Sequence, residues 1–139
     1  MLKKRIFFLG GILLCLLLLF AWGFRLYTKG HQSVAGVSVA FSLDADSLYN
    51  QYQQDEHAAD LKYLGKVIEV RGKISEIQHN GPLEIWILSA HTGSGGINCQ
   101  LFPGEKYPTG NPHTGDSVSI TGKCTGFLMD VNLADCVFK

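Results

Sequence analysis

The residues that could carry chemistry are spread along the chain, and their spacing excludes the common hydrolase sites. The five histidines lack the i, i+4 spacing and the glutamate partner of a zinc hydrolase, and they stand at positions 31, 57, 79, 91 and 113. The run TGSGG at 92–96 lacks the Lys-Ser/Thr pair of a phosphate-binding loop, and Ser94 has no nucleophile-elbow context. The sequence thus indicates no catalytic residue, no metal site and no cofactor, and we predict that the chain is not an enzyme.

A long apolar segment near the N-terminus predicts membrane attachment. Residues 6–24 are nineteen residues without a charge, and a helix of that length rises about 28 Å, enough to cross the hydrocarbon core. Three basic residues lie in 1–5, so the positive-inside rule places 1–5 in the cytoplasm and the following domain in the periplasm. A cleavable signal peptide is less consistent with this run, because its apolar stretch has about 7–15 residues and Ala21-Trp22-Gly23 is a poor cleavage site. We therefore predict a single-pass membrane protein anchored through residues 6–24.

The two parts of the chain differ in charge, although the whole has a net charge of +0. Residues 1–30 hold five basic residues and no acid, whereas residues 31–139 hold seven basic and twelve acidic residues. Proteins that bind a phosphate backbone usually present clustered Lys and Arg. The closest basic cluster comprises Lys62, Lys66, Arg71 and Lys73, with Glu69 within it and Glu76 just after it. Nucleic acid is therefore not the expected partner.

Hydrophobic spacing predicts one amphipathic helix followed by five strands. Apolar residues recur at a helical period over 44–64, and Gly65 supplies a stop. From residue 66 the period changes to two, and a break at Ile77 predicts a bulge near Ser75–Glu76 or strong curvature at Gly72. Shorter strands are expected over 83–90, 96–102, 116–124 and 130–138. Without crossover helices, these strands should be antiparallel and should close into a small barrel over 66–138, with the helix covering one open end.

The segment before this domain has two interpretations. Residues 25–43 are either a juxtamembrane linker or an added edge strand, since Val37, Val39 and Phe41 alternate with small or polar residues. The folded domain itself is expected to span 44–139.

Over residues 44–138 the chain resembles the tRNA_anti-like family of OB-fold domains. The resemblance rests on DADSLYNQYQQDEHAADLKYLGKVIEVRGKISEI, on the INCQLF strand and on VSITGKCTGFLMDVNLADCVF. It implies a mainly β fold, a five-stranded OB barrel preceded by one helix, in exported or membrane-anchored bacterial proteins. The family name records a fold similarity to anticodon-binding domains, and we do not take it to imply a tRNA ligand.

An OB barrel usually binds ligands on the face of its second and third strands and in the loops after strands one and four. This location selects residues 79–82 and 125–130, and three candidate ligand-face residues, Trp86, Phe127 and Asp130. Trp86 alternates with Ile85 and Ile87, so it is expected to project away from the barrel interior. There a base or sugar could stack on it, or the preceding helix or the SVAGVSV segment at 33–39 could cover it. The turn Phe127-Leu128-Met129 either forms a contact patch or folds back over the barrel end.

Three cysteines lie in the part expected to be exported, and they could form one of two alternative disulfides. Cys124 ends the fourth strand and Cys136 lies in the fifth, so a hairpin centred near Asp130 would place them opposite one another. Opposed Cβ atoms lie roughly 4.5–5.5 Å apart, near the separation that a disulfide requires, and the periplasm is oxidising. We predict Cys124–Cys136, with Cys99–Cys136 as the alternative because strands three and five are neighbours in an OB barrel. The remaining interpretation is that all three are buried thiols.

These observations predict a membrane-anchored, extracytoplasmic OB-fold protein that acts as a non-enzymatic binding or assembly module of the bacterial cell envelope. Besides the membrane, the expected partner is an envelope protein. The alternative function is binding of single-stranded nucleic acid or of an oligosaccharide through the barrel face.

Overall fold

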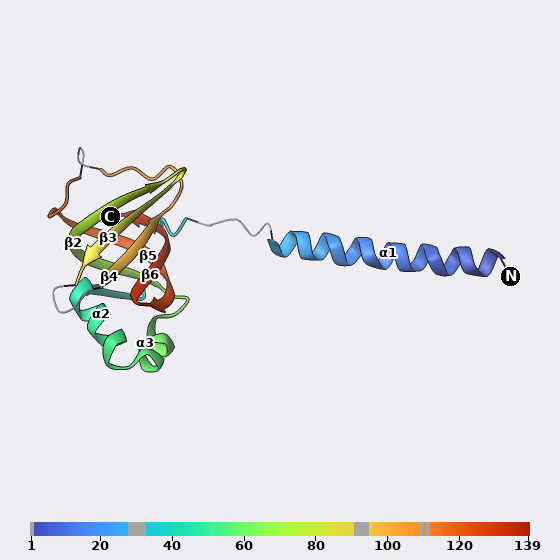
Figure 1. Cartoon of the computed structure of the whole chain (residues 1–139), viewed down its shortest axis with the longest axis horizontal. Helices are drawn as coiled ribbons and strands as arrows, with labels where there is room; N and C mark the ends of the chain where they lie inside the picture. The colour runs from blue at the N-terminus through green and yellow to red at the C-terminus, as the bar shows by residue number, and fades with distance from the viewer. Residues whose placement is uncertain (1, 28–32, 91–94, 109, 111) are drawn as a thin grey trace. The chain divides into compact units, whose positions relative to one another are not determined.

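The computed structural model describes residues 2–27, 33–90, 95–108, 110 and 112–139 (Figure 1). His31, His91 and Ser94 lie outside the described residues. The chain divides into two compact units, Met1–His31 and Gln32–Lys139. The first consists of helix α1 (Leu2–Tyr27), and its described large apolar side chains are all more than half exposed. Of the helices in the described part of the chain, none meets both the length and the hydropathy needed to cross a membrane.

Five strands of the second unit close into a barrel, which confirms the predicted fold (Figure 1). They are β2 (Val67–Asn80), β3 (Leu83–Ser89), β4 (Gly96–Leu101), β5 (Ser117–Leu128) and β6 (Asp130–Phe138). Their order is β2-β3-β4-β6-β5, and β5 pairs back with β2 to complete the ring. Neighbouring strands of the barrel are antiparallel, as predicted, except β4 and β6, whose parallel pairing corrects the prediction that all are antiparallel. A short strand β1 (Phe41–Asp44) adds to β2 in parallel.

Strand β2 is long because its two halves have different partners. Its first half pairs with β5 from Val67 to Lys73, and its second half pairs with β3 from Ile74 to Asn80. The register with β3 shifts between Ile74 and Glu76, which confirms the predicted bulge. The bend lets one strand take part in both sides of the ring.

The predicted single helix over 44–64 is two helices, α2 (Ala45–Gln54) and α3 (Glu56–Tyr63), at one end of the barrel (Figure 1). Asp55 separates them with an extended backbone, φ −156° and ψ 94°, and its carboxylate accepts a hydrogen bond of 2.9 Å from the Ala58 N–H. Asp55 is therefore the N-cap of a new helix, which explains the break. Both helices contribute to the core, through buried Leu48, Tyr52 and Tyr63.

Neither predicted disulfide is present: all four cysteines are free, and Cys99, Cys124 and Cys136 are buried. Leu128 pairs with Asp130, so the hairpin turns at Met129, and a register shift between Cys124 and Gly126 then displaces β5 further. Cys124 consequently faces Leu133, three residues from Cys136. The Cys124 Sγ lies 3.3 Å from the Tyr52 hydroxyl. Burial, followed by a hydrogen bond with Cys99, raises the pKa of Cys136 well above its usual range.

Candidate functional site on the barrel face

Trp86 is a core residue, so the prediction that it projects outward is wrong. Its side chain is 1% exposed, and its ring centroid lies 4.7 Å from that of Phe138 and 5.5 Å from that of Tyr107. The indole Nε1–H donates a hydrogen bond of 2.7 Å to Glu84 Oε1. The cover therefore comes from the end of β6 and from the segment between β4 and β5, and not from the helices.

The other two candidate residues lie apart from Trp86. Phe127 is half-buried and packs its ring on Tyr52 and Tyr49, with centroids 5.5 Å and 6.0 Å apart. It thus folds back over the barrel end, whereas the next two residues of the turn stay exposed. Asp130 begins β6, and its Oδ1 accepts a hydrogen bond of 2.6 Å from the Gly96 N–H.

Asp130 lies at the edge of a hollow on the outer face of the barrel, which we call the barrel-face groove. Since Trp86 and Leu88 face inward, the alternating side chains of β3 face outward and are half-buried. The register aligns them with outward residues of the neighbouring strands: Ile85 pairs with Gln78 and Gln100, and Ile87 with Asn98. The groove has a volume of about 440 Å³ and is lined by Gln78, Ile85, Ile87, Asn98, Gln100, Thr125, Asp130, Asn132, Leu133 and Ala134.

Asn98 is at the centre of the polar network in this groove. Its Nδ2 lies 3.3 Å from Asn132 Oδ1, across the parallel β4–β6 pair, and 3.4 Å from Asp130 Oδ2. The carboxylate can only accept, so it fixes the amide with its NH₂ toward β6. Asn98 Oδ1 is then shielded from solvent and has no hydrogen-bond partner among the described residues. The Asn98 amide is thus held in one orientation by β6.

The lining of the barrel-face groove suits an uncharged, hydrogen-bonding ligand. Its polar groups are four side-chain amides, one hydroxyl and one carboxylate, and its apolar surface is aliphatic. Among the described residues that line it there is no Lys, no Arg and no aromatic ring. Phosphate binding needs cations, and base stacking needs aromatic faces. The groove therefore offers neither of the two usual contacts to single-stranded nucleic acid.

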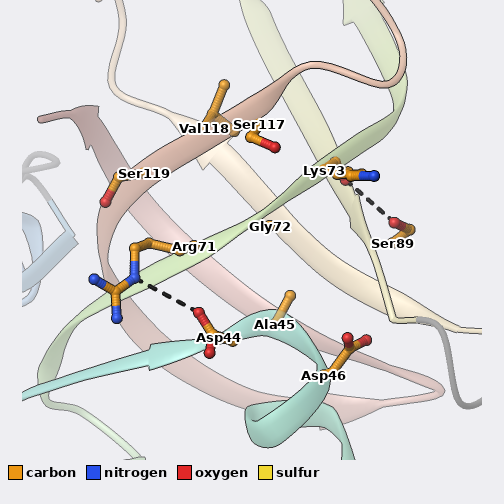
Figure 2. Close-up of a pocket in the computed structure, with 10 residues that line it drawn as sticks. All are labelled: Asp44, Ala45, Asp46, Arg71, Gly72, Lys73, Ser89, Ser117, Val118 and Ser119. Atoms are coloured by element: carbon orange, nitrogen blue, oxygen red, sulfur yellow. Dashed lines mark hydrogen bonds and ion pairs between the residues drawn. The ribbon is translucent and has the colours of Figure 1, made fainter.

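A second hollow, of about 470 Å³, lies where the start of α2 meets β2 and β5 (Figure 2). Figure 2 shows Arg71 of β2 beside Asp44 at the end of β1, and Lys73 of β2 beside Ser89, with Asp46 of α2 also lining the hollow. The Arg71 Nε lies 3.6 Å from Asp44 Oδ1, and both side chains are more than half exposed. Two cationic and two anionic side chains line this hollow, so it favours neither a positive nor a negative ligand. The two hollows have similar volumes, so size does not indicate which of them is the binding site.

The predicted basic cluster does not form a binding stripe. Arg71 is paired as described, and the ammonium groups of Lys62 and Lys66 lie 5.6 Å and 5.3 Å from the centroid of the Phe41 ring. Glu69, which interrupts the cluster, accepts hydrogen bonds from Lys139 Nζ at 2.7 Å and from Ser119 Oγ at 2.8 Å. These bonds, chiefly that from Lys139, lower the pKa of Glu69. Arg71 and Glu69 of β2 are thus engaged in intramolecular contacts.

Sequence reasoning missed the amides of the groove. Asn98, Gln100 and Asn132 lie at alternate positions in INCQL and DVNLA, opposite the apolar residues that face the core. That alternation predicts that the three amides face outward. It does not predict that they lie close together, because this depends on which strands are neighbours in the barrel.

A closed five-stranded barrel in the order β2-β3-β4-β6-β5, with one parallel pair and a polar groove on its face, defines an OB-fold domain. The chain belongs to the tRNA_anti-like family, whose sequence profile matches residues 1–137. Among solved structures, it is similar to a Klebsiella pneumoniae protein described as a "putative nucleic acid-binding lipoprotein", with 15% sequence identity and a TM-score of 0.54. The similarity covers 70% of this chain and 90% of that chain, and it concerns the fold. Comparison with curated proteins gave no significant match.

Proposed function

We propose that this protein is a membrane-anchored, non-enzymatic binding module of the bacterial cell envelope, with its OB-fold domain in the periplasm. The observation that carries the binding role is the barrel-face groove, in which four side-chain amides and the Asp130 carboxylate line one hollow. Its ligand is an uncharged polar chain, and an oligosaccharide has the required density of hydroxyl donors. The acidic domain charge, seven basic against twelve acidic residues in 31–139, supports a ligand without phosphates.

The groove is tested by titrating residues 32–139, which contain the whole hydrophobic core, with neutral oligosaccharides and with a single-stranded oligonucleotide. We expect an oligosaccharide to shift the side-chain amide NMR signals of Asn98, Gln100 and Asn132. Asn98→Ala should weaken this binding about tenfold, since each lost hydrogen bond is worth about 1 kcal/mol or more. Ser117→Ala, in the other hollow, is the control and should bind normally.

Nucleic-acid binding is the second candidate, because it appears in the description of the Klebsiella protein of the same fold. It predicts a complex with the oligonucleotide that weakens steeply between low and high salt. That result, with no response to oligosaccharides, would replace the proposed ligand class.

The anchor is a separate part of the proposal. It is supported by the uncharged run at 6–24 and by the basic residues before it. We expect an alkaline phosphatase fused after Lys139 to be active in the periplasm and to sediment with membranes. Deleting residues 1–30 should release the domain from membranes. Retention of the shortened chain in the membrane fraction would contradict an anchor at this position.

A further inference from the structure

A third hollow, which shares Thr125 and Asn132 with the barrel-face groove, lies where α3 approaches the β5–β6 turn, and we call it the tip hollow. It has a volume of about 420 Å³ and is lined by Glu56, Asp60, Leu64, Thr125, Gly126, Phe127, Leu128 and Asn132. Gly126, with φ +115°, brings the turn close to α3, since a Cβ built on it would lie 3.6 Å from Leu64 Cδ1. The hollow therefore joins two elements that are distant in the sequence.

Large apolar side chains are exposed around the tip hollow. Leu64 and Leu128, which line the hollow, are 48% and 83% exposed, and Met129, next to Leu128 in the turn, is 85% exposed. Met129 also adopts φ +66°, a left-handed conformation that favours Gly or Asn over a large side chain. The left-handed backbone lets the β5–β6 hairpin turn at Met129, but the exposed side chains serve no packing in the described part of this domain. Exposed apolar groups of this kind, gathered at a strained turn, are typical of a contact surface for another molecule.

Negative charge lies within the same hollow. Glu56 and Asp60 are one helical turn apart on α3, so their side chains share a face and repel each other. Burial above all, then Cys124 and the Asp60 carboxylate, raise the pKa of Tyr52, so Asp60 interacts with the Tyr52 hydroxyl as well as lining the hollow. No Lys or Arg is among the described residues that line the hollow, and Lys62 donates to Gln51 Oε1 instead. A cation from another molecule would relieve this repulsion.

We propose that the tip hollow docks a partner polypeptide that inserts one Lys or Arg side chain toward Glu56 and Asp60. Apolar residues on either side of that basic residue pack on the Leu64 and Leu128 side chains. A second copy of this chain is a poorer occupant, because the same face would bring four carboxylates together. An anionic lipid surface is repelled for the same reason. This inference does not depend on the ligand of the barrel-face groove.

The test uses residues 32–139 and two fluorescein-labelled peptides of alternating leucine and serine, one with a central arginine and one with glutamate in its place. Fluorescence anisotropy should show that the arginine peptide binds about tenfold tighter, as expected for a charge-assisted hydrogen bond. The double variant Glu56→Gln/Asp60→Asn should remove that preference. The double variant Leu128→Ser/Met129→Ser should weaken binding of the arginine peptide, and its exposed positions leave the fold unchanged.

The matched control Glu76→Gln/Asp116→Asn removes two charges elsewhere and should bind like the original domain. Equal affinity for the two peptides, or a control that loses the preference as well, would overturn the proposal. So would a concentration-dependent dimer that Leu128→Ser abolishes, since the occupant would then be a second copy. Binding to phosphatidylglycerol vesicles that needs Leu128 and Met129 would overturn it in favour of a lipid surface.

Discussion

Trp86→Ala in residues 32–139 is expected to lower the free energy of unfolding by about 3–5 kcal/mol. Trp86 is among the largest fully buried side chains, and two aromatic rings pack directly on it. Alanine would leave a cavity under Tyr107 and Phe138 and would leave the Glu84 carboxylate without its indole donor. The three rings hold the end of β6 and the segment after β4 against β3, so both should loosen.

Urea denaturation followed by circular dichroism measures this loss, and two variants separate its causes. Trp86→Phe keeps an aromatic ring but loses the indole N–H, so it should lose less than the alanine variant. Ile85→Ala, at a half-exposed neighbouring position, should cost about 1 kcal/mol. If Trp86→Ala unfolded at the same urea concentration as the original domain, Trp86 could not be the core residue described here.

Trp86 also illustrates what alternation in a single strand leaves undecided. The run LEIWILS has bulky apolar residues on both sides of the strand, so its pattern does not say which side faces the core. In β2, by contrast, charged residues alternate with Ile68 and Val70, so the pattern identifies the side that faces the core. In β3 the side that faces the core is determined by the segment between β4 and β5, whose Tyr107 covers the Trp86 indole. No local feature of β3 encodes that contact.

The register and pairing of the strands explain why the observed positions of the cysteines differ from those predicted and why the groove amides lie close together. The order of elements and the barrel could be predicted because the change of period from helix to strands is strong. The Cys124–Cys136 pairing depended on the position of the turn and on the absence of bulges, and each moves the partner by a residue or more. The Asn98–Asn132 pair, in contrast, follows from the β4–β6 pairing of an OB barrel. It could have been found by comparing the outward positions of those two strands.

Gly96→Ala should also destabilise the domain, by about 2–3 kcal/mol, because it overpacks the start of β4. A Cβ at this position would overlap the backbone carbonyl oxygen of Leu88, which cannot rotate away as a side chain could. Strand β4 would have to move from β3, and the hydrogen bond from the Gly96 N–H to Asp130 Oδ1 would lengthen. Because Asp130 holds the Asn98 amide, the change should reach the barrel-face groove.

Thermal unfolding measures the stability of this variant, and NMR measures the effect on the groove. Ser89→Ala is the matched control, since Ser89 pairs with Gly96 across the β3–β4 ladder but loses only a hydrogen bond of 3.4 Å to the Lys73 carbonyl. It should change the unfolding free energy by less than about 0.5 kcal/mol. The side-chain amide signals of Asn98 and Asn132 should shift in Gly96→Ala and stay in place in Ser89→Ala. Unchanged signals in a destabilised Gly96→Ala would mean that Asp130 keeps its position without the glycine, so that the groove is held by β6 alone.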